Sequence, residues 1–307
     1  MKKKQKILVL VDGSDRSWMT IDYIREVEAF RKGELVLYQV YSEIPECYWD
    51  LDTDPIRPTV LKGFEEWRKE KLESLEKFMA EAKRRLIAAG FEEKQVKIKI
   101  HQREKGIARD ILDECKKGYD SVILRRRGMG TIKSITLGSV STKLISKFPD
   151  VPMMLAGRRP HNKKLLLAVD GSPASTQAVD FIGRYFGPYD YSAELFHVIR
   201  GMGTLNPMTP EYLPPEIITL MQDEVIRKID QFKKRLIKAG FDEKKVTGKV
   251  VSGAASRAEE IVREADAGNF GTIVIGRRGL SRVQDFFMGR VSYKVIHSGR
   301  DFTVWVV

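Results

Sequence analysis

Short continuous apolar runs alternate with stretches of helical periodicity along the whole chain. The apolar runs, such as ILVLV at residues 7–11, have the length of a strand and are apolar on both faces, which is typical of strands buried in a parallel sheet. Between these runs, apolar residues recur about every 3.6 residues, which predicts amphipathic helices. The pattern therefore predicts an α/β protein.

The predicted elements occur in the same order in both halves of the chain. In the first half we expect strands at residues 7–11, 35–41, 96–101, 121–124 and 152–155, and helices at residues 14–30, 61–89, 107–116 and 138–148. In the second half we expect strands near Leu165, Leu195, Lys245, Thr272 and Phe302, and helices near Ser175, Glu211, Ala258 and Val291. Each half is thus predicted to be a doubly wound domain with a five-stranded parallel sheet, whose ligands bind beyond the carboxyl ends of the strands.

An internal repeat supports the same division. KRRLIAAGFEEKQVKIKI at residues 83–100 matches KKRLIKAGFDEKKVTGKV at residues 233–250, an offset of 150 residues. ILVLVDGSDRS from Ile7 matches LLLAVDGSPAS from Leu165 at an offset of 158. A period of this length indicates a duplicated domain and not a solenoid. We predict domains at residues 1–157 and 163–307, joined through the polar segment AGRRPHNKK at residues 156–164.

Polar and glycine residues follow the first and fourth predicted strands of each half. VDGS places Asp12 and Asp170 at the end of the first strand, where Asp-Gly is also ordinary turn chemistry. After the fourth strand come RRRGMGTIKSITLGS (residues 125–139) and GRRGLSRVQDFFMGR (residues 276–290), each a glycine-framed loop that leads into a helix. Such a loop allows close backbone approach and offers the free N–H groups of a helix N-terminus to an anion.

Composition and charge exclude several classes of protein. Of 307 residues, 42% are hydrophobic and 31% are charged, as in a globular protein, and no apolar run approaches the 20 or so residues of a membrane span. We expect a cytoplasmic protein without a membrane partner. The excess of 54 Lys and Arg over 42 Asp and Glu, a net charge of +12, favours anionic ligands. The four histidines are too scattered for a metal site, and neither a Walker phosphate loop nor a catalytic triad motif is present.

The VDGS turns and glycine loops resemble those of the universal stress proteins, and the chain is similar to the tandem members of that family. The family motif is an Asp after strand one, then G-x2-G-x9-G followed by Ser or Thr. The resemblance implies a Rossmann-like fold similar to the adenine nucleotide alpha hydrolases. It also implies binding of ATP, or of ADP or AMP, with or without Mg²⁺, in a stress-response or signalling role, with no enzymatic activity beyond slow ATP hydrolysis.

The resemblance also implies which residues bind the nucleotide. In the second half they are Val169, Asp170, Val198, Ile275, Gly276, Gly279, Gly289, Arg290, Val291 and Ser292. In the first half they are Asp12, Val40, Gly128, Gly138, Ser139, Val140 and Ser141. Each half departs from the motif once. Arg125 stands where the motif has its first glycine and is expected to obstruct the ligand, whereas Arg290 replaces a Ser with a side chain that itself binds phosphate. We therefore prefer the second site.

The fifth strands bear on assembly. In the family this sheet edge pairs across a two-fold axis, which implies an intramolecular pseudo-dimer through residues 153–155 and 303–306, with a further homodimer as an option. An alternative function is an interaction module with decayed nucleotide sites, in which Arg125–Arg127 and Arg277–Arg278 contact a nucleic-acid backbone. The absence of a recognition motif that combines aromatic and basic residues argues against nucleic acid.

Overall fold

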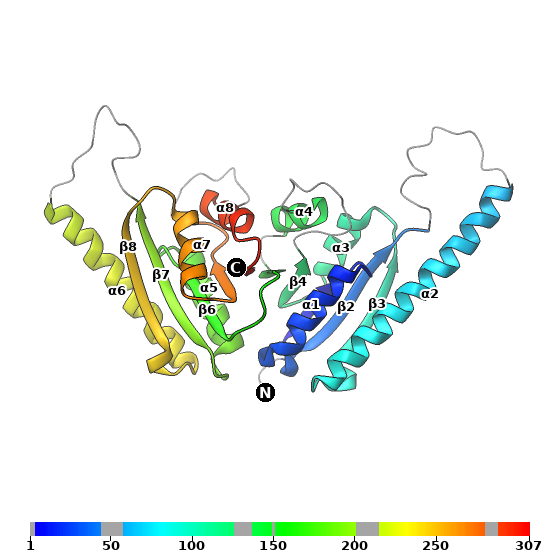
Figure 1. The fold of residues 1–307 in the computed structure, drawn as a ribbon, viewed down its shortest axis with the longest axis horizontal. Coiled ribbons are helices and arrows are strands. Elements are labelled where there is room, and N and C mark those ends of the chain that lie inside the picture. The colour runs from blue at the N-terminus through cyan, green and yellow to red at the C-terminus, as the bar shows by residue number, and fades with distance from the viewer. Residues whose placement is uncertain (1–3, 44–57, 126–136, 149–150, 201–214, 280–287) are drawn as a thin grey trace, which may run out of the picture. The chain divides into compact units, whose positions relative to one another are not determined.

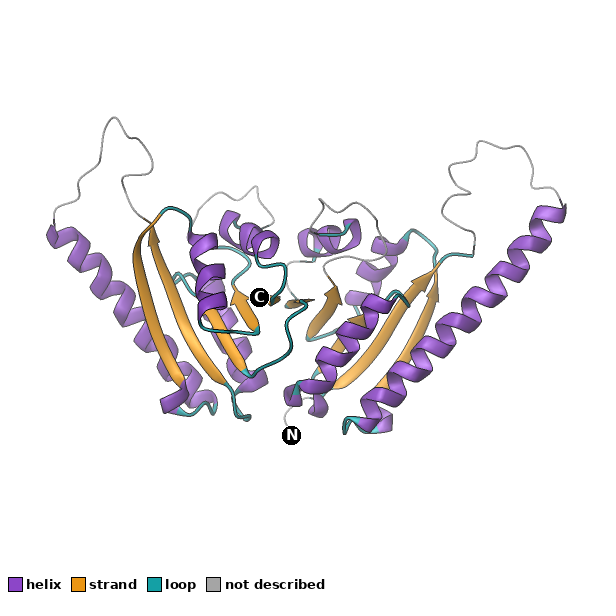
Figure 2. Ribbon diagram, in the orientation of Figure 1, coloured by secondary structure: helices purple, strands orange, loops and turns teal. Residues whose placement is uncertain are grey.

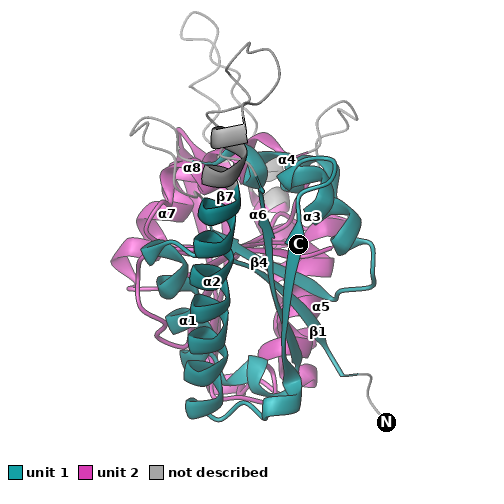
Figure 3. Ribbon diagram, turned by 90° about the vertical axis from the view of Figure 1, so that its right-hand side faces the viewer, with its two compact units in different colours: residues 1–148 teal, residues 149–307 magenta. Residues whose placement is uncertain are grey.

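The computed structural model describes residues 4–43, 58–125, 137–148, 151–200, 215–279 and 288–307. The chain divides into two compact units, Met1–Phe148 and Pro149–Val307 (Figure 3). Both units are built from helices packed against strands (Figure 2). Within the described residues, no helix is both long and apolar enough to cross a membrane.

The first unit has a parallel sheet (Figure 1). Its described strands are β1 (Lys6–Leu10), β2 (Glu34–Tyr41), β3 (Val96–Gln102) and β4 (Ser121–Arg125), in the order β3-β2-β1-β4. Its helices are α1 (Asp15–Glu26), α2 (Pro58–Ala88), α3 (Ile107–Cys115) and α4 (Ser139–Lys147). Helix α1 packs beside α2, and α3 beside α4. Right-handed crossovers account for this pairing, because the strand order reverses direction at β1.

The second unit repeats this arrangement (Figure 1). Its described strands are β5 (Met153–Ala156), β6 (Lys164–Ala168), β7 (Ser192–Arg200), β8 (Val246–Ala254), β9 (Thr272–Ile275) and β10 (Thr303–Val306), in the order β5-β10-β9-β6-β7-β8. Its helices are α5 (Pro173–Phe186), α6 (Pro215–Ala239), α7 (Arg257–Ala267) and α8 (Arg290–Ser298). Strand β5 is antiparallel to β10, and the other pairs are parallel. The last strands of the two sequence halves are therefore neighbours, with Trp305 opposite Met154.

The central strands carry the core of each unit. Residues 7–9 of β1 and residues 165–167 of β6 are at most 1% exposed, which accounts for the continuous apolar runs of the sequence. Trp305 of β10 is completely buried against Phe181 of α5, with ring centroids 4.9 Å apart. The α/β fold predicted from hydrophobic pattern is confirmed.

Several predicted boundaries differ from those in the structure. The helix expected over residues 14–30 ends at Glu26, because Val27 is extended (φ −86°, ψ 98°) and completely buried. The chain then continues as a 3-10 helix, Glu28–Lys32, that buries Phe30. The strand expected from residue 152 begins at Met153. The helix expected near Glu211 is α6, which begins at Pro215, while residue 211 itself lies outside the described residues.

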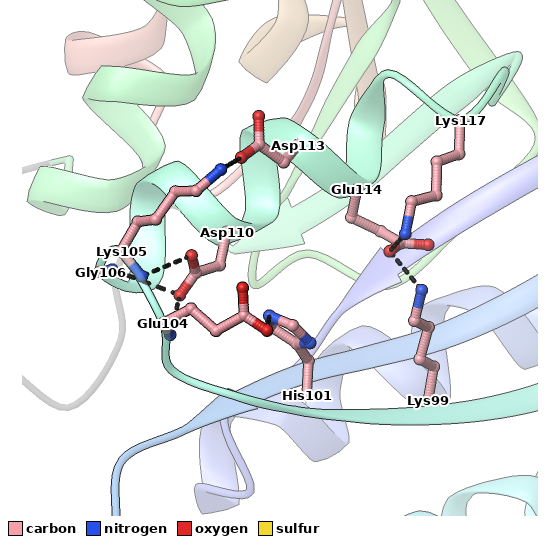
Figure 4. Close-up of polar contacts among 9 residues, drawn as sticks. All are labelled: Lys99, His101, Glu104, Lys105, Gly106, Asp110, Asp113, Glu114 and Lys117. Carbon is pink, nitrogen blue, oxygen red and sulfur yellow. Dashed lines mark hydrogen bonds and ion pairs between the residues drawn. The ribbon is translucent and has the colours of Figure 1, made fainter.

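A buried carboxylate joins α3 to β3 in the first unit (Figure 4). Glu114 is 4% exposed and accepts hydrogen bonds from Lys99 Nζ at 2.5 Å and Lys117 Nζ at 3.0 Å. The Tyr119 hydroxyl donates a third bond at 2.7 Å. Burial alone would raise the pKa of Glu114, but these three donors outweigh burial and lower the pKa to about 2. The side chain is therefore a charged structural anchor at neutral pH.

Candidate functional site

The turn after β6 holds the Asp170 carboxylate in one orientation. Its Oδ1 accepts hydrogen bonds from Ser172 N at 3.0 Å and from Ser175 Oγ at 2.7 Å, and Ser175 Oγ accepts one from Asp170 N at 3.0 Å. The turn requires φ +76° at Gly171, a conformation that glycine adopts without strain. Ser172 then caps α5, with Pro173 in its first turn. The turn predicted from Asp-Gly thus also fixes the orientation of the Asp170 carboxylate.

The first unit contains the same network. Asp12 Oδ1 accepts bonds from Ser14 N at 3.1 Å, Ser14 Oγ at 2.6 Å and Ser17 Oγ at 2.6 Å, and Gly13 has φ +71°. Sequence analysis did not single out the buried serines Ser17 and Ser175. The signal was their recurrence five residues after each aspartate, in DGSDRS and DGSPAS.

The loop after β9 approaches Asp170 closely. A Cβ on Gly279 would collide with Asp170 Oδ2, and a Cβ on Gly276 would lie 3.0 Å from the Ala174 Cβ. The Gly289 N–H donates to the Arg277 carbonyl at 2.9 Å and brings the two ends of the loop together. Gly279 is therefore required by the space available and not by the conformation of the backbone, and Gly276 has little room for a side chain.

A cavity of about 1130 Å³ lies at this end of the second unit, at the end where α8 is seen in Figure 1. All ten residues predicted for the second site line it: Val169, Asp170, Val198, Ile275, Gly276, Gly279, Gly289, Arg290, Val291 and Ser292. The structure therefore brings together residues that are spread over more than 120 positions of the sequence, from 169 to 292. The cavity is bounded by the ends of parallel strands, as the doubly wound fold predicts.

The charged residues of the cavity wall are predominantly cationic. Among the described residues that line it, five are cationic, Lys228, Arg257, Arg278, Arg290 and Lys294, and two are carboxylates, Asp170 and Glu224. His197 also lines the cavity. Its Nδ1 donates to the Val169 carbonyl at 2.7 Å, and desolvation lowers the pKa of His197, which keeps the ring neutral at pH 7. Lys228, Arg257 and His197 were not identified from the sequence, because they come from helices and a strand with no recognisable motif.

The residues predicted for the first site are only partly described. Gly128 lies outside the described residues, whereas Gly138 is the N-cap of α4 and Val40 lies on β2. Ser139, Val140 and Ser141 form the first turn of α4. Ser141 Oγ donates to the Arg125 carbonyl at 2.7 Å, as Ser292 Oγ does to the Gly276 carbonyl at 2.7 Å in the second unit. The link between the fourth strand and the following helix is therefore the same in both units.

The Arg125 side chain lies against α1. Its guanidinium donates to the Arg16 carbonyl, and its Nη2 lies 3.4 Å from Met19 Sδ. Arg16 matches Ala174 at the offset of 158, so Arg125 contacts the residue of α1 that corresponds to the neighbour of Gly276 on α5. Whether this position obstructs a ligand of the first unit stays a prediction.

The described arginines of the alternative nucleic-acid function, Arg125, Arg277 and Arg278, are not all exposed. Arg277 is 5% exposed, and its Nη2 donates to the Val151 carbonyl at 3.3 Å. Arg125 binds α1, and Arg126 and Arg127 lie outside the described residues. Of the described members of this set, Arg278 is the exposed one, and it lines the cavity. The geometry thus favours a ligand in the cavity over a polymer on the surface.

Comparisons with known proteins agree with the fold and the repeat. A model of the universal stress protein family matches residues 4–155 and again residues 161–307. A universal stress protein of Mycolicibacterium smegmatis is 25% identical over 298 residues, which are 95% of this chain and 93% of that protein. The universal stress protein YxiE of Bacillus subtilis is 28% identical over 138 residues, which are 43% of this chain and 90% of that protein. The crystal structure of a universal stress protein from Archaeoglobus fulgidus, 19% identical, superposes with a TM-score of 0.60 over 99% of this chain and 98% of that chain.

Proposed function

Because the chain belongs to the universal stress protein family, we propose that it binds an adenine nucleotide, ATP in the first place, in the cavity of the second unit. Binding would serve a stress-response or signalling role. The family membership accounts for the paired domains and the glycine loops. The choice of site and ligand depends on the geometry of the second unit.

The observation that carries the proposal is the close approach of Gly279 to the fixed Asp170 carboxylate on the wall of the cavity. One side of this contact is a carboxylate that can accept hydrogen bonds from the hydroxyl or amino groups of a nucleoside. The other side is a glycine loop that ends at the N-terminus of α8, where free N–H groups bind phosphate. The Arg290 guanidinium adds a charged donor at the same place.

The proposed role is binding and not catalysis. Asp170 Oδ1 is already engaged by Ser172 and Ser175, and His197 Nδ1 is engaged by a carbonyl. Neither arrangement supplies an activated nucleophile, so we propose at most slow ATP hydrolysis. A Mg²⁺ ion, where present, would be bound mainly by the phosphates of the nucleotide.

The proposal also extends to assembly. Strand β5 lies at the end of the first family match, and it pairs with β10 of the second match. We propose that this pairing replaces the contact between two separate chains, so that the protein is an intramolecular pseudo-dimer.

Release and titration of nucleotide test the proposed function. The purified full-length chain is denatured and its supernatant chromatographed, and we expect released adenine nucleotide. Calorimetry with ATP, ADP and AMP then compares Asp170→Ala with Asp12→Ala, which removes the equivalent carboxylate and hydrogen-bond network from the first unit. We expect Asp170→Ala to weaken binding about tenfold or more and Asp12→Ala to change it little.

The proposed function is wrong if no nucleotide is released and no adenine nucleotide gives a binding heat. In that case, binding of RNA or DNA that falls steeply with salt would support the interaction module instead. The choice of the second site is wrong if Asp12→Ala abolishes binding while Asp170→Ala retains it.

A further inference from the structure

The cations of the cavity come from two different parts of the second unit. Arg278, Arg290 and Lys294 belong to the segment from the end of β9 to α8. Lys228 and Arg257 belong to α6 and α7, which follow β7 and β8 in the chain. In the sheet, β6 lies between β9 and β7, and Asp170 follows β6. The carboxylate is therefore placed between the two sets of cations.

Arg257 is held at the end of β7 with most of its donors available. Its Nε donates to the Val198 carbonyl at 3.2 Å. Its two Nη groups have no hydrogen-bond acceptor among the described residues, and they belong to a side chain that lines the cavity. A guanidinium anchored through Nε with free Nη groups is well suited to bind a phosphate.

Lys228 lies over the turn that carries Asp170. A Cβ on Gly171 would be 2.5 Å from Lys228 Cδ and 3.0 Å from its Nζ. The Nζ also lies 3.7 Å from Glu224 Oε1, a long distance for an ion pair. Because Glu224 is 51% exposed, this pair compensates little of the charge of the lysine.

The first unit has apolar residues at both positions. At the offset of 150, Arg257 matches Ile107 and Lys228 matches Phe78. Phe78 is 7% exposed and packs against Trp18 in a tilted arrangement, with ring centroids 4.4 Å apart. The duplicated scaffold therefore does not require a cation at either position in order to fold.

The loop before α3 also differs from its counterpart in the second unit. In the first unit the Asp110 carboxylate accepts the backbone N–H groups of Glu104 and Lys105, each at 3.0 Å, and of Gly106 at 3.3 Å (Figure 4). The matching segment of the second unit, residues 254–256, contributes Ala255 and Ser256 to the cavity wall. In the first unit the Asp110 carboxylate thus binds the backbone of this loop, whereas in the second unit residues of the loop line the cavity.

We infer that the second unit binds a nucleotide that carries phosphate on both sides of its ribose. One phosphate group binds at the glycine loop and Arg290, and a second, on a ribose hydroxyl, binds at Arg257 and Lys228. The neutral sugar faces Asp170, which accepts hydrogen bonds and repels an anion placed directly against it. The inference rests on the proposed function, because it assumes that the first phosphate binds at the loop.

Calorimetry on the full-length chain with three ligands tests the inference. Adenosine 3′,5′-bisphosphate has one phosphate on each side of the ribose, ADP has two phosphates on the 5′ side, and AMP has one. We expect the bisphosphate to bind about tenfold more tightly than AMP, and more tightly than ADP, since a charge-assisted contact to phosphate is worth about one factor of ten or more. ADP separates the position of the second phosphate from total charge.

Three variants assign the effect to Arg257. Arg257→Ile imports the residue of the first unit, and Arg257→Gln keeps a polar side chain without the charge. Both are expected to reduce the ratio of bisphosphate to AMP affinity from about ten to about one. Arg263→Ile removes the same charge from the same helix outside the cavity, where Arg263 pairs with Glu260, and should leave the ratio unchanged.

The outcomes are distinguishable. Binding of AMP and ADP without any advantage for the bisphosphate, or an advantage that survives both Arg257 variants, overturns this inference and leaves the proposed function in place. An advantage that Arg263→Ile also removes overturns it as well, because the effect is then one of long-range charge. If none of the three ligands binds, the inference fails, and the proposed function fails with it only when ATP gives no binding heat either.

Discussion

Asp170 Oδ2 occupies the space into which a side chain on Gly279 would project. The two residues belong to segments more than 100 positions apart, the turn after β6 and the loop after β9. Both residues line the cavity of the candidate site. Their proximity leaves no room for a side chain at Gly279.

Gly279→Ala is expected to displace either the loop or the carboxylate. Overpacking of this kind costs about 1 to 3 kcal/mol, so nucleotide affinity should fall about tenfold or more. Calorimetry measures the affinity, and thermal unfolding without ligand measures the cost to the fold. Gly289→Ala is the comparison, because its Cβ would have its nearest neighbours at 3.6 Å. Equal losses for the two variants would show that the contact with Asp170 is not what matters.

Arg125→Gly should restore the glycine of the family motif in the first unit. The substitution removes a guanidinium that binds the Arg16 carbonyl, and we expect a loss of about 1 kcal/mol in stability. If Arg125 is what obstructs the first site, the stoichiometry of nucleotide binding rises from one to two per chain. Calorimetric titration gives this number directly, and a value that stays at one would contradict the prediction.

Glu114 should make the first unit sensitive to acid. Its pKa is lowered from an ordinary 4.5 to about 2, so its contribution is fully present above pH 4.5 and is lost as the pH falls toward 2. The shift corresponds to about 3 kcal/mol. Glu114→Gln should therefore destabilise the protein by roughly this amount at pH 7 and by much less near pH 2.5, measured by urea unfolding.

The matched control for Glu114→Gln is Glu264→Gln in the second unit. Glu264 pairs with Lys249 at 2.6 Å but is 14% exposed, so we expect a smaller loss of about 1 kcal/mol. A loss at Glu264 as large as that at Glu114 would count against the role given to burial and to the additional donors.

Glu194 should have the opposite dependence on pH. Burial raises its pKa, and the charge of Glu264 raises it further. A group whose pKa is raised by folding stabilises the protein at low pH and loses that contribution as the pH rises through its folded value. Glu194→Val, which imports Val36 of the first unit, should therefore stabilise the protein by about 1 kcal/mol at pH 8, with the gain shrinking toward pH 4. Urea unfolding at the two pH values tests this, and a variant less stable than the parent at pH 8 would contradict it.

The elements of the fold follow largely from local pattern. Residues 7–9 and 165–167 read as buried strands because every side chain in them is apolar, and the structure buries them almost completely. The end of α1 could not be predicted from the sequence. Val27 has an extended backbone and a completely buried side chain, and both depend on neighbours that are distant in the sequence.

The sequence by itself determined the duplication, the α/β class and the family, because all three depend on periodicity and on short motifs such as VDGS and the glycine loops. Only the tertiary structure decided which side chains share the cavity. Lys228 and Arg257 belong to surface helices of mixed charge, and Arg125 turns toward α1. The physical reason is that the packing of strands and helices in space decides which side chains are neighbours. Residues far apart in the chain therefore carry no local sequence pattern that predicts their contact.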